Sequence, residues 1–333
     1  MKIDAALEVT NLRDVPAIAQ AAEAMGFDAI WTGEKQHEAI LPLPLVAEHT
    51  QRMQFGTAIA VAFARSPMVL AHAAWDLAAQ SSGRFILGLG TQVKAHIERR
   101  FGVTWAPPVP RLREMILALR AIWDCWQNGA PLNFRGQHYK LTLMTPFFNP
   151  GPIDAPRAPI FIAGVNVNMC QLAGELADGF LVHPYHTARY LREVVLPAIE
   201  AGAAKTGRAR SAVQIAGSTF IITNDAEREA VRSQVAFYAS TPSYRSVMEC
   251  HGWSEMSERL SFMAARGKWN EMPGEISDEM LEAFALIGKP NELPDKLIAK
   301  YAGLLDRVGL YAPFAPRQND ELWRALIAAV HAQ

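Results

Sequence analysis

A histidine and two acidic residues follow directly on an apolar run near the start of the chain. Residues 33–38 read Gly-Glu-Lys-Gln-His-Glu. A histidine imidazole in water has a pKa of about 6.5, so a residue of this type can act as a general acid or base near neutral pH, and Glu34 stands close to His37 in the sequence. Alternatively, Glu34 and His37 only cap the next helix or form a hydrogen bond at the rim of the fold. We take both as candidate catalytic residues.

A second candidate site is the run Gly-Leu-Gly-Thr-Gln-Val-Lys-Ala-His at 88–96. A dinucleotide-binding fingerprint would need a third glycine where Val93 stands, so this run does not form one. Its glycines could let a flat ring approach the backbone. A tight turn followed by a solvated basic helix face explains the same residues equally well. The positive side chains in and after the run are Lys94, His96, Arg99 and Arg100.

The turn Ala-Gly-Val-Asn-Val-Asn at 163–168 precedes a predicted helix. Small residues at a helix N-terminus expose backbone N–H groups, and the helix dipole there favours an anion such as phosphate. An ordinary helix cap by Asn166 or Asn168 is the alternative. The rim therefore suits a phosphorylated organic cofactor, which spacing alone does not identify.

Three other classes of site are disfavoured. His183 and His186 lie three residues apart, but Pro184 argues against a helix there, and no carboxylate or cysteine cluster completes a metal site. The chain has no Gly-x-Ser-x-Gly nucleophile motif, and no glycine-rich run carries the lysine of a phosphate-binding loop. We expect no metal centre, serine hydrolase or nucleotide triphosphatase.

The elements that must position these residues alternate along the whole chain between short apolar runs and amphipathic helices. The clearest helix signal spans 112–126, and runs such as Phe-Ile-Leu-Gly-Leu-Gly at 85–90 are typical of parallel strands buried on both faces. The number of predicted strands and the length of the chain favour an α/β fold, namely a (β/α)8 TIM barrel that forms one domain over 1–333. A doubly wound sheet is the less favoured alternative. The predicted strands span 3–9, 27–32, 54–61, 84–88, 159–163, 179–183, 213–222 and 308–311.

Two stretches interrupt the repeat, as insertions after strands four and seven. Residues 129–158 are rich in Pro and Gly, with a possible hairpin around 135–137, and residues 240–286 show no clean period. Long insertions in a barrel tend to be lids or substrate loops, which is the role we expect for both.

The amino-acid composition narrows the classes of function that this protein could have. Half of the 333 residues are hydrophobic, and 32 basic side chains balance 33 acidic ones, for a formal charge of −1. Such a balance argues against a nucleic-acid partner. The three cysteines form no close pair, the first residues do not read as a signal peptide, and no apolar run reaches the roughly 18 residues of a membrane span. We expect a cytoplasmic protein with no membrane association.

Several passages resemble one enzyme family over nearly the whole chain, least well at 240–286. The most specific are Gly-Thr-Ala-Ile-Ala-Val-Ala-Phe-Ala-Arg-Ser-Pro at 56–67 and Ser-Gly-Arg-Phe-Ile-Leu-Gly-Leu-Gly at 82–90. The family is the luciferase-like monooxygenase superfamily of flavin- and deazaflavin-dependent barrels. The resemblance is nearest to the subgroup that depends on coenzyme F420, an 8-hydroxy-5-deazaflavin. Supporting passages lie at 75–77, 96–101, 143–148, 177–179 and 288–290.

The resemblance implies roles for individual residues. It implies a non-prolyl cis peptide at Ala58–Ile59 behind the cofactor ring, and His37 as the acid–base group with Glu34 beside it. The remaining implied cofactor residues are Gly90, Thr91 and His96 near the ring, Ala163, Gly164, Val165 and Asn166 at the phosphate, and His183 beside them. The cations implied for the anionic cofactor tail are Arg65, Lys94, Arg99 and Arg100.

The implied function is an oxidoreductase that moves a hydride between coenzyme F420 and a small organic substrate, acting as a homodimer. The alternative is a monooxygenase that uses reduced FMN and oxygen, and a third possibility is a non-catalytic flavin-binding protein. Val93 stands where the sugar-phosphate dehydrogenase relatives carry a glutamate, which disfavours glucose 6-phosphate as substrate.

Overall fold

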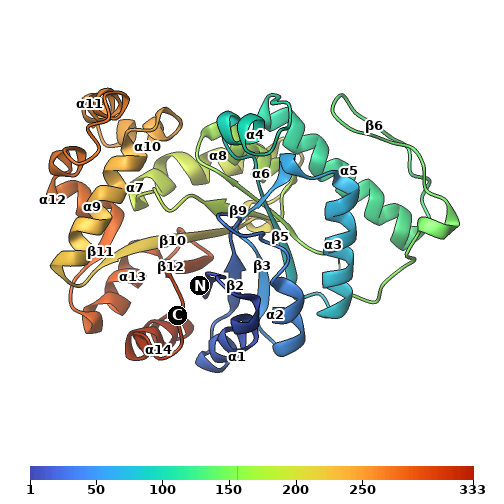
Figure 1. Ribbon diagram of the computed structural model, residues 1–333, viewed down its shortest axis with the longest axis horizontal. Helices are drawn as coiled ribbons and strands as arrows, with labels where there is room; N and C mark the ends of the chain where they lie inside the picture. The colour runs from blue at the N-terminus through green and yellow to red at the C-terminus, as the bar shows by residue number, and fades with distance from the viewer. Residues whose placement is uncertain (156) are drawn as a thin grey trace.

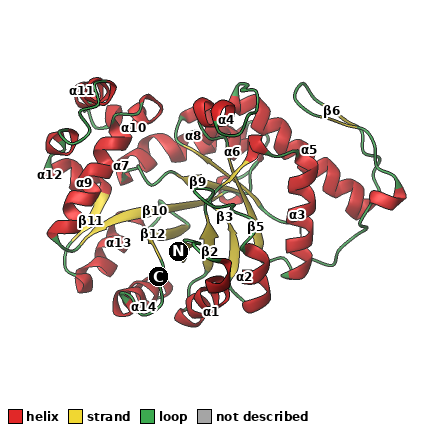
Figure 2. Cartoon of the chain, viewed as in Figure 1, coloured by secondary structure: helices red, strands yellow, loops and turns green. Residues whose placement is uncertain are grey.

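In the computed structural model, which describes residues 1–155 and 157–333, eight parallel strand positions close into a barrel. Closure is shown by β1, which pairs in parallel with the second strand on one side and with the last on the other. Figure 2 shows the strands at the centre with helices around them. The predicted TIM barrel is confirmed. The barrel strands are β1 (Lys2–Leu7), β2 (Ala29–Thr32), β3 with β4 (Gln54–Thr57 and Ala60–Val61), β5 (Phe85–Gly90), β8 (Ile160–Gly164), β9 (Gly179–Val182), β10 (Gln214–Ile222) and β12 (Arg307–Pro313).

The helices of the outer ring bury one apolar stripe each against these strands. The predicted helix at 112–126 lies within α5, whose buried face includes Leu112, Ile116 and Trp123, and Gly129 ends it at a φ of +73° that suits glycine. The long or barrel-covering helices are α1 (Val15–Met25), α2 (Leu43–His49), α3 (Pro67–Gln80), α5 (Pro108–Asn128), α6 (Val167–Leu176), α8 (Leu196–Ala204), α9 (Asp225–Ala239), α13 (Leu293–Tyr301) and α14 (Asp320–His331).

A polar ion pair lies inside the barrel. Asp4 binds Arg307 through two hydrogen bonds of 2.8 and 2.9 Å, and it also accepts the indole N–H of Trp31 at 2.9 Å. Because Arg307 is almost fully buried, its charge requires this bidentate partner. The apolar side chains that pack inside the barrel around Trp31 are Ala29, Ile86, Phe161, Leu181 and Ala216.

The third strand departs from the prediction. A continuous strand was expected over 54–61, but the ladder stops after Thr57 and resumes at Ala60. The peptide bond between Ala58 and Ile59 is cis. Ala58 and Ile59 form no regular ladder pairs, although the Ala58 N–H still donates to the carbonyl of Thr32 in β2 at 2.6 Å.

The first insertion is not a lid. Residues 129–158 contain the expected antiparallel hairpin, formed by β6 (Phe134–Arg135) and β7 (Lys140–Leu141). Glu114 of α5 accepts the backbone N–H groups at 137, 138 and 139, which fastens the hairpin to that helix. The hairpin extends beyond α5, away from the barrel (Figure 1). None of its described residues lines the large cavity at the barrel mouth, so the expected role is wrong for this segment.

The second insertion is more ordered than its sequence indicated. Residues 240–286 fold into α10 (Arg245–Cys250), α11 (Ser254–Ala265) and α12 (Asp278–Phe284), and β11 (Ala285–Ile287) pairs with the end of β10. Short helices of mixed polarity leave no clear period in the sequence, which is why none was predicted here. From this insertion Ser243 and Tyr244 reach the cavity.

No helix in residues 1–155 or 157–333 is both long enough and apolar enough to cross a membrane. Within the same ranges no group of three His, Cys, Asp or Glu side chains is placed to hold a metal ion.

Candidate active site

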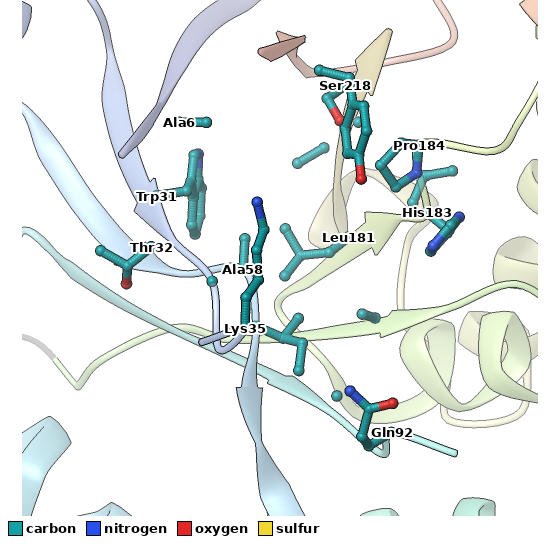
Figure 3. Close-up of a pocket in the computed structure, with 18 of the residues that line it drawn as sticks. Ala6, Trp31, Thr32, Lys35, Ala58, Gln92, Leu181, His183, Pro184 and Ser218 are labelled. Atoms are coloured by element: carbon teal, nitrogen blue, oxygen red, sulfur yellow. The ribbon is translucent and has the colours of Figure 1, made fainter. Parts of the chain in front are cut away.

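A cavity of about 990 Å³ opens where the carboxyl ends of the barrel strands meet. That is the end of a TIM barrel at which catalytic residues are placed. Figure 3 shows Trp31 and Thr32 on one side of it, Ser218, Pro184 and His183 on the other, and the Lys35 side chain between them. The sequence-predicted residues that line the cavity are His37, Ala58, Ile59, Gly90, Thr91, Ala163, Gly164, Val165, Asn166 and His183.

One wall of the cavity is made smooth by close backbone packing. A Cβ atom on Gly90 would lie 2.7 Å from the Ile59 side chain, which is too close. Glycine at this position therefore allows Ile59 to pack directly against the backbone of β5. Two residues before Gly90 on the same strand, Gly88 is bonded to Thr57 of β3. The Thr57 hydroxyl donates to the Gly88 carbonyl at 2.6 Å and accepts the Gly88 N–H at 2.9 Å. The region around Ala58 is thus a rigid surface of small residues.

Glu34 supports this wall and does not line the cavity. Its carboxylate accepts the Val61 N–H at 2.7 Å, and its backbone N–H donates to the Ile59 carbonyl at 3.0 Å. The same carboxylate pairs with Arg65 at 2.7 Å, and its side chain is only 7% exposed. The predicted catalytic contact of Glu34 is therefore replaced by a positioning one: it supplies the hydrogen bonds that the broken third strand lacks.

Arg65 belongs to the same hydrogen-bond network as Glu34. Burial acts to lower its pKa, but hydrogen bonds to Glu34 and then Glu38 raise the pKa overall, so the guanidinium stays charged. Arg65 does not line the cavity and is already paired with both acidic side chains, so the structure does not bring it to the place where the cofactor tail was expected. The loop at 33–38 is also held by the Thr32 hydroxyl, which donates to the Ala39 carbonyl at 2.6 Å.

His37 lies at the cavity rim with an exposed side chain. Its ring makes no hydrogen bond to any described residue. The clamped loop fixes where its backbone lies, while the imidazole is free to meet a ligand in the cavity.

The turn after β8 has the geometry expected of an anion cradle. Asn166 caps α6 by accepting the Met169 N–H, and the first N–H groups of that helix have no partner within the helix. A Cβ on Gly164 would lie 2.3 Å from the Met169 side chain, so glycine lets strand and helix pack closely. The hydroxyl of Tyr190 donates to the Val165 carbonyl at 2.7 Å and fixes the turn.

The predicted cations divide into two groups. Lys94 lines the cavity, together with Lys35 from the loop after β2. His96 and Arg99 are exposed on α4 (Lys94–Arg99) and do not line the cavity, and Arg100 donates to the backbone carbonyl of Lys35. His96 is thus not brought to the site, because its helix turns it toward solvent.

His183 is held neutral. Burial, and next the neighbouring His186, lower its pKa to about 4. Its Nδ1 accepts the Tyr185 N–H at 3.1 Å, and its Nε2 lies 3.2 Å from the Tyr244 hydroxyl. A neutral imidazole with Nδ1 accepting carries its proton on Nε2, which therefore donates to Tyr244.

Sequence reasoning missed four polar residues that line the far wall. Tyr311 ends a predicted strand, so the rule that sites lie at strand ends could have found it. Ser218 lies within another predicted strand and carried no such signal. Gln234 on α9 and Tyr244 in the second insertion are brought to the cavity by tertiary packing alone.

Comparison with known proteins supplies four relevant findings. A family model described as luciferase-like monooxygenase matches residues 2–307. A Mycobacterium tuberculosis protein of uncharacterized function is 46% identical over 314 residues, 92% of each chain. A 5,10-methylenetetrahydromethanopterin reductase of Archaeoglobus fulgidus is 31% identical over 312 residues, 90% of each chain. The structure of a coenzyme F420-dependent tetrahydromethanopterin reductase from Methanopyrus kandleri matches with a TM-score of 0.75 at 22% identity, covering 98% of this chain and 96% of that one.

Proposed function

The chain belongs to the luciferase-like monooxygenase family, and from this membership we propose that it is an oxidoreductase that transfers a hydride between coenzyme F420 and a small organic substrate. The observation that carries the proposal is the pairing of two features in one cavity: the wall of small residues at Ala58 and Gly90, and the glycine turn at the start of α6. The relative from Archaeoglobus fulgidus, by its name a reductase, supports reduction as the chemistry.

The residues present fit a tricyclic cofactor with a phosphate. The wall at Ala58 and Gly90 has no bulky side chain that would block a flat ring, and Ile59 packs back onto the glycine. Gly164 and Asn166 would hold the phosphate through the exposed N–H groups of the helix start. A bound deazaflavin would supply a ring carbon that donates or accepts a hydride, which the protein's own side chains cannot do.

In this proposal the protein orients the reactants and moves a proton. His37 gives a proton to the substrate oxygen in reduction, or takes it in oxidation, because an imidazole at the cavity rim can serve as a general acid or a general base. Glu34 positions the wall through Val61 and Arg65. Lys94, the cation of the predicted set that lines the cavity, would meet the anionic tail of the cofactor.

The test is a titration of the purified protein with coenzyme F420 and, separately, with FMN, followed by quenching of cofactor fluorescence, then turnover with each. We expect micromolar binding of F420 and hydride transfer to or from a member of a substrate panel. Lys94→Glu should weaken F420 about tenfold or more and FMN much less, because only F420 carries an oligoglutamate tail; the effect should shrink at high salt.

The alternatives correspond to other outcomes of the same titration. Micromolar binding of FMN alone, with oxygen-dependent turnover, would establish the reduced-FMN monooxygenase. Binding of either cofactor without turnover over the whole panel would favour a non-catalytic flavin-binding protein. The homodimer and the cytoplasmic location stay predictions.

A further inference from the structure

A buried phenol lies behind the turn after β8, outside the cavity. Tyr190 ends α7 (Ala188–Tyr190), is 1% exposed and does not line the cavity. Its hydroxyl lies 2.7 Å from the Val165 carbonyl and 3.0 Å from the Ser246 hydroxyl. Ser246 belongs to α10 of the second insertion, which lies against α7 (Figure 1). The phenol thus connects the second insertion to the turn that is proposed to hold the cofactor phosphate.

The direction of both hydrogen bonds follows from the groups that form them. A carbonyl oxygen only accepts, so the Tyr190 O–H donates to Val165. A phenol has a single proton, so in the second bond Ser246 donates to the Tyr190 oxygen. Burial raises the pKa of Tyr190 to about 12, which keeps its proton in place at neutral pH. Both bonds therefore run from the insertion toward the turn.

Fixing the Val165 carbonyl also fixes the next backbone N–H. The peptide bond between Val165 and Asn166 is trans, so its C=O and N–H point in opposite directions. The carbonyl is directed at Tyr190, which lies outside the cavity, whereas Val165 and Asn166 both line the cavity. The Asn166 N–H is therefore directed to the cavity side of the turn.

The N–H groups at this turn differ in what sets their direction. Among the described residues none accepts a hydrogen bond from the N–H of Asn166, Val167 or Asn168, whereas the Met169 N–H is bound by the Asn166 side chain. Val167 and Asn168 belong to the first turn of α6, so the helix itself orients their N–H groups. The Asn166 N–H precedes the helix, and its direction depends on the peptide that Tyr190 holds.

We propose that Tyr190 is a positioning residue for the cofactor phosphate: it aims the Asn166 N–H at the phosphate, and Ser246 of the second insertion holds Tyr190 in place. The inference rests on the proposed function for the identity of the ligand. Without the phenol hydroxyl, the peptide after Val165 loses the hydrogen bond that sets its direction. A phosphate would then have to order that peptide as it binds, which lowers affinity.

The loss should fall on ligands that carry a phosphate. The wall proposed to face the ring, at Ala58 and Gly90, belongs to the third strand and to β5, which Tyr190 does not hold. A ligand with the same ring and no phosphate should therefore bind equally well with or without the Tyr190 hydroxyl. A purely structural role would instead weaken both kinds of ligand together.

The experiment compares two ligands by fluorescence titration: coenzyme F420, and the same deazaflavin with its ribityl chain but without the phosphate and tail. The quantity measured is the ratio of their two dissociation constants in the wild type, Tyr190→Phe and Ser246→Ala. The matched control is Tyr301→Phe. Tyr301 is also fully buried, its hydroxyl donates to Thr219 at 2.9 Å, and it does not line the cavity. Unfolding in urea reports the stability of each protein.

We expect Tyr190→Phe to bind F420 about five- to tenfold more weakly, as the loss of one hydrogen bond predicts, and the phosphate-free ligand as the wild type does. Ser246→Ala should lose only about two- to threefold, because α10 stays tied to α7 through His251 and Thr187, whose side chains lie 2.8 Å apart. Tyr301→Phe should lose stability but keep the wild-type ratio. Equal weakening of both ligands in Tyr190→Phe, or unchanged F420 binding, would overturn the inference.

A second measurement separates this inference from the proposed function. If the wild type bound neither ligand, the proposed function would fail, and a titration with inorganic phosphate would decide the role of Tyr190. In protein labelled with 15N-asparagine, phosphate should shift the amide signal of Asn166 in the wild type and in Tyr301→Phe, and much less in Tyr190→Phe. An equal shift in all three proteins, or none in the wild type, would then contradict the inference.

Discussion

The carboxylate of Glu34 accepts the backbone N–H of Val61 at 2.7 Å, which joins the loop after β2 to the point where the third strand resumes. The contact spans the two residues, Ala58 and Ile59, that form no regular ladder pairs. The same carboxylate neutralises the half-buried Arg65. One acidic side chain thus supports both the wall of the cavity and the loop that carries His37.

Replacing Glu34 by Ala should therefore destabilise the whole site. The change leaves the Val61 N–H unpaired and removes the main partner of a guanidinium whose side chain is 14% exposed. We expect the free energy of unfolding in urea to fall by about 3 kcal/mol. Glu38→Gln is the control: it removes the charge of a side chain that pairs with the same arginine and is 41% exposed, but keeps an oxygen for the N–H groups of Ile40 and Leu41, so about 1 kcal/mol or less should be lost. Equal losses would contradict the assigned role.

His37→Ala should lower turnover by about a hundredfold or more, as the loss of a general acid or base does. Binding of the cofactor should change by less than about twofold, because the exposed imidazole lies at the rim and forms no hydrogen bond to the described residues that make up the turn after β8. His96→Ala provides the comparison, since His96 is exposed outside the cavity, and its kinetics should match those of the wild type. Wild-type turnover in His37→Ala would remove that residue from the mechanism.

Gly90→Ala tests the smooth wall. The added methyl group would lie 2.7 Å from the Ile59 side chain and push it into the cavity. We expect cofactor affinity, measured by fluorescence titration, to fall about tenfold, with a smaller loss of stability of about 1–2 kcal/mol. Gly274→Ala is matched to it, because a Cβ there meets nothing within 4 Å and the backbone needs no positive φ. A Gly90→Ala protein with full affinity would place the ring elsewhere.

Stability should fall in mild acid because of two buried histidines. Burial is the first cause that lowers the pKa of His183 and of His186, each from 6.5 to about 4. Between these values the unfolded chain binds protons that the folded chain does not, so the free energy of unfolding decreases as the pH drops from about 6.5 toward 4.

The contribution of His186 can be isolated with His186→Asn. Between pH 6 and 4.5 the slope of the unfolding free energy should be smaller by about 1.4 kcal/mol per pH unit, the value for one proton. The measurement is urea unfolding at several pH values. An unchanged slope in His186→Asn would mean that the ring is protonated in the folded protein.

Much of the fold could be predicted from the sequence because it follows from local patterns of apolar residues. Apolar runs buried on both faces identified the strands, and the spacing of apolar residues identified α5. Since sites lie at the carboxyl ends of barrel strands, the order of the strands alone brought His37, Gly90 and Gly164 to one place.

Only the tertiary structure decided which polar groups face the cavity. Glu34 and His96 sit at plausible sequence positions, yet one is turned inward by Val61 and Arg65 and the other outward by its helix. Tyr244 and Gln234 arrive from segments far along the chain, and their contacts depend on how separate elements pack. The spacing of apolar residues in the sequence indicates which face of a helix or strand is buried. The partner of a polar side chain depends instead on how segments far apart in the sequence pack together.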